Sequence, residues 1–228
     1  MKRFKLVPLV FLIAISLNAC LETDPIELEK RVVVEYTFSG LNNIYTSPTD
    51  TIEIESVRMF VPRFWVITTN DDSLNSNVPF VFSYSQADLD NPKEIVNANV
   101  GFGGLEDYDD FRMQVQLFSA ESGISDNTLA NEGNPLSFSI AGRYNGEIFR
   151  YNSQYEFDRS ISYTEINLTD RQETMILTLI GNSAEWFADP SQSGALLSPI
   201  DPGNQNVINQ QFEESFSIAS ERTTALED

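Results

Sequence analysis

Clustered acidic side chains are the first feature of the sequence with the potential for chemistry. They lie in two segments, 70–75 and 106–110, where Asn residues and a Tyr accompany them. The candidate metal ligands in these segments are Asp71, Asp72, Glu106, Asp107, Asp109 and Asp110. Calcium takes about six to eight oxygen ligands, which loop carboxylates and amides supply. Neither segment has the EF-hand spacing or its glycine at the sixth position, so a solvated acidic loop is the alternative to a calcium site.

Catalysis through histidine is excluded, because the sequence contains no His. The sequence also lacks a Walker A loop, a Ser-x-x-Lys motif and the Asp-Thr/Ser-Gly triplet of aspartic proteases. A hydrolase that uses two carboxylates about 5–10 Å apart stays open, since such groups meet in space rather than in sequence. Among 34 acids chance pairs are expected, so the sequence favours a protein without enzymatic activity.

The aromatic residues indicate a different kind of site, a platform on which a sugar ring stacks. Most of the 16 Phe, 8 Tyr and 2 Trp fall in phase with the faces of expected strands, which is typical of core packing. Trp65 is the exception, because it lies opposite in phase to Phe64 and Val66. We therefore expect Trp65 to be exposed and to be the candidate contact for a ligand.

The charge balance restricts the partners further. The chain has 34 Asp and Glu against 14 Lys and Arg, a net charge of −20. Three of the basic residues lie in the first twenty, which hold no acid, so the remainder carries 34 acids against 11 bases and a charge of −23. Such a surface repels phosphate, which excludes nucleic-acid binding through a basic patch.

The N-terminus has the pattern of an export signal. The basic segment Met1–Lys5 precedes an apolar run, Leu6–Leu17, that is shorter than the roughly 20 residues of a membrane-spanning helix. The sequence Leu-Asn-Ala-Cys at 17–20 resembles a bacterial lipobox. This resemblance implies cleavage between Ala19 and Cys20 and attachment of acyl chains such as palmitate to Cys20. Cys20 is the only cysteine of the sequence, so no disulfide within the chain would compete with acylation of its thiol.

The residues after Cys20 predict a tether. Leu21–Lys30 holds four acids and a Pro, and spans at most about 35 Å when extended. An acidic stretch behind the lipidated cysteine resembles the surface-export signals of Bacteroidetes lipoproteins, which implies an anchor in the outer membrane. We therefore expect a signal peptide at 1–19, the lipidated Cys and tether at 20–30, one folded domain at 31–220 and a frayed terminus at 221–228.

Most of the remaining chain consists of short segments in which apolar and polar residues alternate, the pattern of half-buried strands. We expect such strands at Arg31–Phe38, Pro79–Ser85, Ile95–Phe102, Phe111–Phe118, Ile161–Leu168 and Glu173–Ile180. The segment Thr51–Thr69 changes phase near Glu55-Ser56, which predicts a β-bulge. Pro62 ends its strand or confines it to a sheet edge. Glu173–Ile180 is apolar on both faces, which predicts a central strand.

Asn145-Gly146, between two alternating runs, predicts a tight hairpin. A two-residue loop would pair Tyr144 with Glu147, Gly142 with Phe149, and Ile140 with Tyr151. Farther on, Gly181–Asp189 predicts a helical turn that carries Trp186 and Phe187. Val207–Ile218 predicts an amphipathic helix that docks against this pair.

These elements predict an all-β domain, an antiparallel β-sandwich of the immunoglobulin-like or jelly-roll-like kind with one or two short C-terminal helices. A closed up-and-down barrel is the alternative. The layout resembles uncharacterised Bacteroidetes lipoproteins through the lipobox, the hairpin at 142–149, the Trp-Phe pair and the segment 208–216. A loosely similar set includes the periplasmic copper-binding partners of methanobactin, which bind metal through His. This chain has no His, so no metal site is carried over.

Together these features favour a lipid-anchored envelope protein that binds a glycan or an envelope protein, or serves as a structural accessory. A carboxylate-based hydrolase and a calcium-stabilised module are the alternatives. The membrane leaflet, the ligand and the oligomeric state stay open at this point.

Overall fold

A computed structural model describes residues 30–41, 43–68, 73–76, 78–88, 91–100, 107–167 and 173–224. The expected signal segment, Cys20 and the tether up to residue 29 lie outside the described residues. Within the described part, the alternating segments form strands that assemble into three sheets.

Sheet A has the strand order β13-β12-β1-β7. Its strands are β1 (Lys30–Ser39), β7 (Lys93–Val100), β12 (Glu173–Asn182) and β13 (Phe216–Thr224). Alternate side chains of β1 are buried, namely Val32, Val34, Tyr36 and Phe38. The strand β12 lies between β1 and β13, which confirms the central strand predicted from its two apolar faces. Its pairing with β1 is parallel, which differs from the antiparallel neighbours predicted from the pattern of short strands.

Sheets B and C are connected by chain segments that continue from one sheet into the other. Sheet B has the order β10-β9-β3-β2, and β6 also pairs with β3. Its strands are β2 (Ile44–Thr46), β3 (Thr51–Val61), β6 (Phe80–Ser85), β9 (Phe138–Tyr144) and β10 (Glu147–Ser153). Sheet C has the order β11-β8-β4-β5. Its strands are β4 (Arg63–Thr68), β5 (Ser73–Ser76), β8 (Asp107–Val115) and β11 (Phe157–Asn167).

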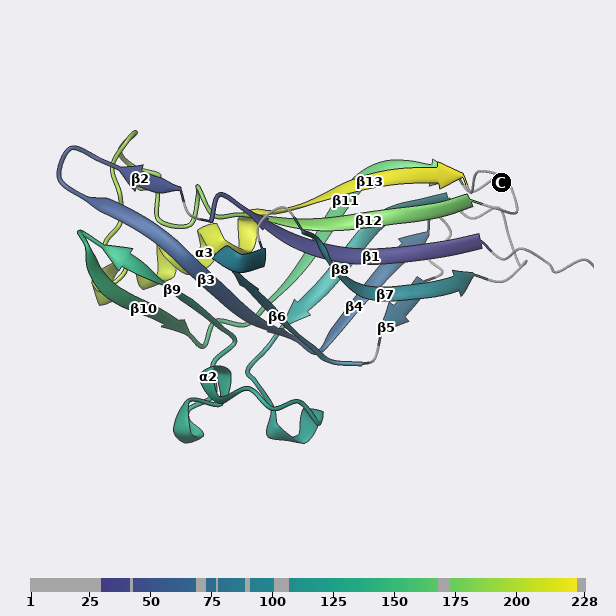
Figure 1. Ribbon diagram of the computed structural model, residues 1–228, viewed down its shortest axis with the longest axis horizontal. Coiled ribbons are helices and arrows are strands. Elements are labelled where there is room, and N and C mark those ends of the chain that lie inside the picture. Colours follow the sequence, from purple (N-terminus) through teal and green to yellow (C-terminus); the bar gives the residue numbers. More distant parts are fainter. Residues whose placement is uncertain are drawn as a thin grey trace, which may run out of the picture.

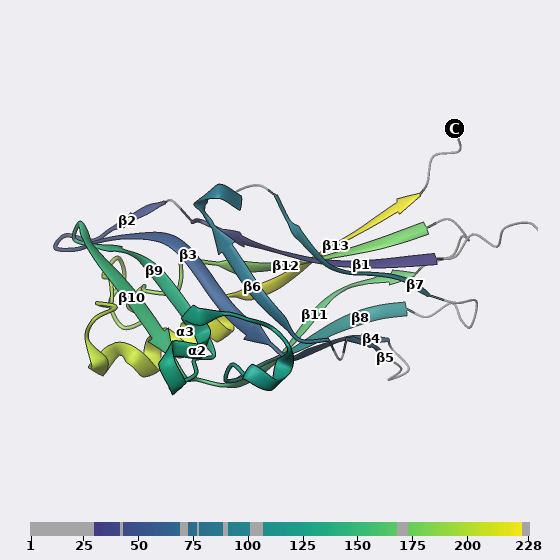
Figure 2. The same cartoon turned by 60° about the horizontal axis from the view of Figure 1, so that its bottom comes forward.

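The helical elements are short. The α-helices are α2 (Asn127–Ala130) and α3 (Gln205–Glu214). Single 3-10 turns lie at Gln86–Asp88, Ala120–Ser122, Asn131–Gly133 and Pro202–Asn204. Sheets A and C lie over one another in one half of the elongated molecule, and sheet B forms the other half with α3 against it (Figures 1 and 2). One hydrophobic core draws side chains from all three sheets, so the all-β, sandwich-like fold is confirmed.

Two local predictions are confirmed in detail. The pairing of β3 with β9 shifts between Ile54 and Ser56, which is the β-bulge inferred from the phase change. The β9–β10 hairpin pairs Gly142 with Phe149, as predicted. Its turn residues Asn145 and Gly146 have φ values of 51° and 82°, the left-handed conformation that an Asn-Gly turn supplies at little cost.

Other boundaries differ from the expectation, mostly toward the C-terminus. Residues 181 and 182 still belong to β12, and turns rather than a helix lead to Asp189. The helix α3 ends at Glu214, and its C-cap Ser215 donates its N–H to the Gln211 carbonyl oxygen at 3.0 Å and its hydroxyl to the Phe212 carbonyl oxygen at 2.8 Å. The chain then returns as β13, which pairs with β12 as far as Thr224, so Glu221–Thr224 is strand rather than a frayed end.

The strands β7 and β8 also lie a few residues earlier than Ile95–Phe102 and Phe111–Phe118. Only residues 225–228 of the expected frayed terminus lie outside the described part of the chain.

Candidate functional site

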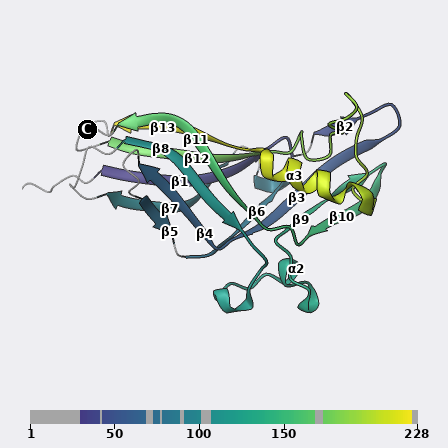
Figure 3. The same cartoon turned by 180° about the vertical axis from the view of Figure 1, so that it is seen from behind.

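The outward face of sheet C carries a tryptophan surrounded by polar side chains. In β4, Phe64 and Val66 are buried, so Trp65 points to the opposite side and is half-buried there. We call this surface the Trp65 face, and it consists of Arg63, Trp65, Arg112, Gln114, Asp158 and Ser160. Figure 3 views the molecule from the side on which sheet C lies.

Strand register brings these residues together from three strands. Trp65 lies opposite Arg112 of β8, and Arg112 lies opposite Ser160 of β11. On the other side, Trp65 faces Asn75 of β5. One row across the sheet therefore holds an aromatic ring with polar groups on both sides of it.

Two guanidinium groups flank the ring. The Cζ atom of Arg112 lies 5.4 Å from the centre of the Trp65 ring, and that of Arg63 lies 5.7 Å from it. Both distances are within the range of cation–π attraction. Arg112 is held in place because its Nε donates to Oδ1 of Asp158 at 2.7 Å and its Nη2 donates to Oδ2 of the same carboxylate. The ring is thus fixed beside an oriented arginine.

The same ion pair sets the protonation of its members. The hydrogen bond from Arg112 holds the pKa of Asp158 below its ordinary value, although partial burial opposes this effect. The Asp158 carboxylate in turn raises the pKa of Arg112. Both groups are therefore charged at neutral pH, and their hydrogen-bonding edges have fixed directions.

The arrangement suits recognition of a polar ring. An indole offers an apolar face for the C–H side of a sugar, and planar guanidinium, amide and carboxylate groups exchange hydrogen bonds with neighbouring hydroxyl groups. A few fixed polar groups around an apolar contact are what orients a small ligand.

The acidic candidates for calcium are only partly described. Asp71, Asp72 and Glu106 lie outside the described residues, and of Asp107 only the backbone is described. Asp109 and Asp110 belong to β8 rather than to a loop. Asp109 has no partner in either neighbouring strand, because the register shifts there, and Asp110 accepts hydrogen bonds from Ser160 and Ser162 at 3.3 and 3.4 Å.

Within the described ranges, the structure holds no group of three or more metal-binding side chains.

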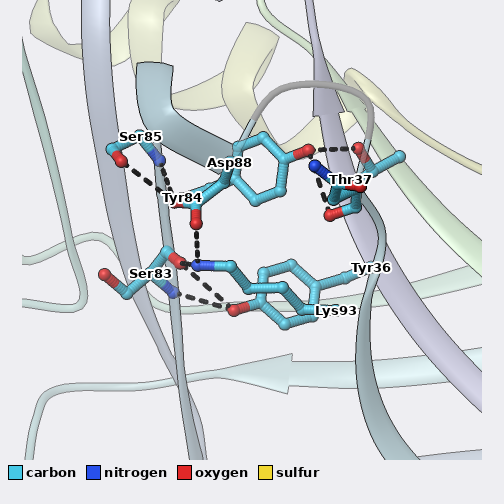
Figure 4. A network of polar contacts seen from close by, with 8 residues as sticks. Tyr36, Thr37, Ser83, Tyr84, Ser85, Asp88 and Lys93 are labelled. Carbon is cyan, nitrogen blue, oxygen red and sulfur yellow. Dashed lines mark hydrogen bonds and ion pairs between the residues drawn. The ribbon is translucent and has the colours of Figure 1, made fainter.

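A polar network that sequence reasoning missed joins β1, β6 and β7 (Figure 4). Nζ of Lys93 donates to the carbonyl oxygen of Ser83 at 2.7 Å and lies 2.9 Å from Oδ1 of Asp88. The other oxygen of Asp88 accepts from the backbone N–H of Ser85 at 2.8 Å. Partial burial opposes ionisation of Asp88, but the bonds from Lys93 and Ser85 outweigh it and lower the pKa of Asp88.

A second part of this network lies beside the lysine. The hydroxyls of Thr37 and Tyr84 are 2.9 Å apart, and the hydroxyl of Tyr36 lies 3.2 Å from the carbonyl oxygen of Ser83. Burial raises the pKa of Tyr36. These groups satisfy one another's hydrogen-bonding capacity. The network therefore holds sheet A against β6, and we assign it a structural role.

A groove of about 400 Å³ was also not foreseen from the sequence. It lies between β10 and the loop that leads into α3. Its walls are formed by Arg150, Tyr151, Asn152, Pro199, Ile200, Asp201, Pro202 and Gln205. Asp201 is the single carboxylate among these lining residues, so the groove does not supply the carboxylate pair of a glycosidase.

The second tryptophan has the opposite environment. Trp186 is fully buried, its ring centre lies 5.0 Å from that of Phe212, and its Nε1 donates to Oγ of Ser215 at 2.8 Å. This confirms the packing of Trp186 against the C-terminal helix, whereas the ring of Phe187 lies 5.7 Å from Phe149 and 6.1 Å from Tyr151 of β10. Trp65 is therefore a surface residue, and Trp186 is a core residue.

Comparison of the chain with family models, curated proteins and solved structures finds no match. No helix in the described ranges has the length and apolarity to cross a bilayer.

Proposed function

We propose that this chain is a lipid-anchored protein of the bacterial cell envelope that binds a glycan, without catalysis, through the Trp65 face. The observation that carries this proposal is the position of Trp65, half-buried on an outward sheet face between Arg63 and Arg112. In a core role the ring would share the full burial of Trp186. The net charge of −20 argues for a neutral ligand rather than a polyanion.

The direction of the chain supports the anchor. The strand β1 begins at Lys30, at the end of the molecule where β13 also ends (Figure 1). Only the nine residues 21–29 would separate a lipid on Cys20 from this end of the fold. Two or three acyl chains, at about 0.8 kcal/mol for each buried methylene, hold a protein on a bilayer almost irreversibly.

The glycan proposal is tested by screening the protein against purified envelope and capsular polysaccharides. We expect at least one of them to bind the wild type and to lose about tenfold or more in affinity with Trp65→Ala, because the stacking face is removed. Ile148→Ala is the control, since it removes an exposed apolar side chain from a different sheet, sheet B. Equal binding by the Trp65→Ala and wild-type proteins would overturn the assignment.

The anchor is tested separately by labelling cells with radioactive palmitate. We expect label on the wild-type protein and none on Cys20→Ser, whose precursor stays unprocessed. Label that persists in the Cys20→Ser protein would show that the lipid site is elsewhere.

A further inference from the structure

The strand β10 has one side open. It pairs with β9 and with no other strand of the described chain. In a hairpin with a two-residue turn, the pair beside the turn and every second pair after it exchange both backbone hydrogen bonds. Glu147, Phe149 and Tyr151 therefore bond to β9. The N–H and C=O groups of the residues between them, Ile148, Arg150 and Asn152, point away from the sheet.

The strand β10 lies at the outer edge of sheet B (Figures 2 and 3), and its residues Arg150, Tyr151 and Asn152 line the groove described above. Its far wall contains Pro199 and Pro202, which have no N–H group, and Ile200, whose surface is 67% exposed. On β10 itself, Ile148 is 78% exposed. An unpaired strand edge next to an apolar wall is a template for an added strand.

The two sides of the edge differ in what they would contact. The side chain of Tyr151 points inward, toward α3, where its hydroxyl donates to the carbonyl oxygen of Gln205 at 3.0 Å. The loop with Ile200 therefore lies on the inner side of β10. The side chain of Arg150 is exposed on the outer side, and it forms no ion pair with any described residue.

We propose that the edge of β10 binds an extended peptide segment of a partner protein by strand addition. In an added strand, successive side chains alternate between the two faces. Residues on the inner face would pack on Ile200 and Pro202, which are exposed, so they must be apolar. Residues on the outer face would lie beside Arg150, so an acidic side chain fits there. The partner segment therefore has apolar residues at alternate positions and a single acidic residue beside Arg150, because the neighbouring outer-face residues of β10 are Ile148 and Asn152.

A second copy of the chain is a poorer occupant of the same edge. Each copy carries a net charge of −20, which opposes self-association. Antiparallel pairing of two β10 strands centred on Arg150 would also place the two arginines directly opposite each other, which is destabilising. This surface is separate from the Trp65 face on sheet C, so a result that contradicts one of the two proposals leaves the other unaffected.

The test uses the full-length protein and a fluorescein-labelled Val-Glu peptide, in which Val alternates with Thr except for one Glu at the centre. The Val-Lys peptide has Lys in place of that Glu. We expect saturable binding by fluorescence anisotropy and at least tenfold slower hydrogen exchange at the amides of Ile148, Arg150 and Asn152. Arg150→Glu should weaken binding about tenfold, because attraction becomes repulsion. Arg31→Glu is the matched control, since it makes the same charge change on an exposed residue of sheet A and should leave the affinity unchanged.

A second peptide removes the backbone contribution alone. Methylation of alternate backbone nitrogens of the Val-Glu peptide should abolish binding if its amides pair with β10. Any of three results would overturn the proposal: no binding of the Val-Glu peptide, equal binding of a Val-Lys peptide, or protection of other strand edges in place of β10. Protection of these amides in the free protein, together with a dimer in sedimentation, would also contradict it by assigning the edge to a second copy.

Discussion

Replacement of Phe212 by alanine tests how the C-terminal helix closes the core. Phe212 is fully buried in α3. Its ring stacks on Phe138 of β9, with centres 4.0 Å apart and planes 8° apart. The ring also lies 5.0 Å from Trp186 and 5.3 Å from Phe216, the first residue of β13. One side chain thus joins sheet B, sheet A and the turn between β12 and α3.

The expected cost of Phe212→Ala follows from this burial. Removal of a fully buried Phe ring costs about 3–5 kcal/mol, because the transfer free energy of the ring is lost and a cavity stays behind. For a domain of this size, each kcal/mol lowers the melting temperature by about 2–4 °C. The melting temperature should therefore fall by about 6–20 °C. Phe212→Leu keeps most of the volume and should cost about 1.5 kcal/mol or less.

The measurement is urea unfolding followed by the fluorescence of Trp186, which lies against the altered site. We expect the midpoint to fall for Phe212→Ala while the slope of the transition stays unchanged. A loss below about 1 kcal/mol would refute the reasoning, because it would mean that α3 contributes little to the shared core.

Three further outcomes follow from the structure. Gly142→Ala should destabilise the protein by about 3 kcal/mol or more in urea unfolding, because the new Cβ would lie 2.0 Å from the backbone oxygen of Glu53. A variant as stable as the wild type would contradict the close approach of β9 to β3. Asp88→Asn should cost about 1 kcal/mol at pH 7. The pKa of Asp88 is lower in the folded than in the unfolded protein. The stability difference between wild type and Asp88→Asn should therefore be complete above the unfolded pKa of about 4 and disappear as the pH falls through the folded pKa. A stability difference that persists in acid would contradict the role of the Lys93 pair. Trp65→Ala should change the free energy of unfolding by less than about 1 kcal/mol, and a larger loss would place Trp65 in the core.

Local patterns in the sequence were sufficient where a short-range rule decides the structure. The Asn-Gly turn fixes the hairpin register, because both residues adopt positive φ. The phase change at Glu55-Ser56 predicted the bulge, because side-chain alternation reports directly which residues face the core. Burial of Val66 and Phe64 on one side of β4 likewise separates Trp65 from the core.

Long-range pairing could not be predicted from the same patterns. The parallel pairing of β1 with β12 joins residues more than 140 positions apart, and no periodicity encodes a partner. The helix expected to continue to Ile218 stops at Glu214, and the chain from Phe216 onward pairs with β12 instead. The spacing of Ile208, Phe212 and Phe216 also fits a helix followed by a strand.

The candidate site shows the same limit. The phase of Trp65 was visible in the sequence, but its arginine and aspartate neighbours come from β8 and β11, which only the sheet register brings beside it. The groove at β10 requires the loop Pro199–Pro202 to lie against a strand almost fifty residues earlier in the chain. Asp201 and the two prolines of this loop are residues that favour turns, so in the sequence they predict only a loop.

The most direct test of glycan binding at the Trp65 face is a fluorescence titration that uses the two tryptophans as separate reporters. A bound polysaccharide should change the emission of the wild type and of Trp186→Phe, because Trp65 is half-buried and Trp186 is enclosed in the core. We expect no change in Trp65→Phe, whose remaining tryptophan is Trp186. An undiminished change in Trp65→Phe would contradict binding at the Trp65 face, because it would place the ligand away from the outward face of sheet C.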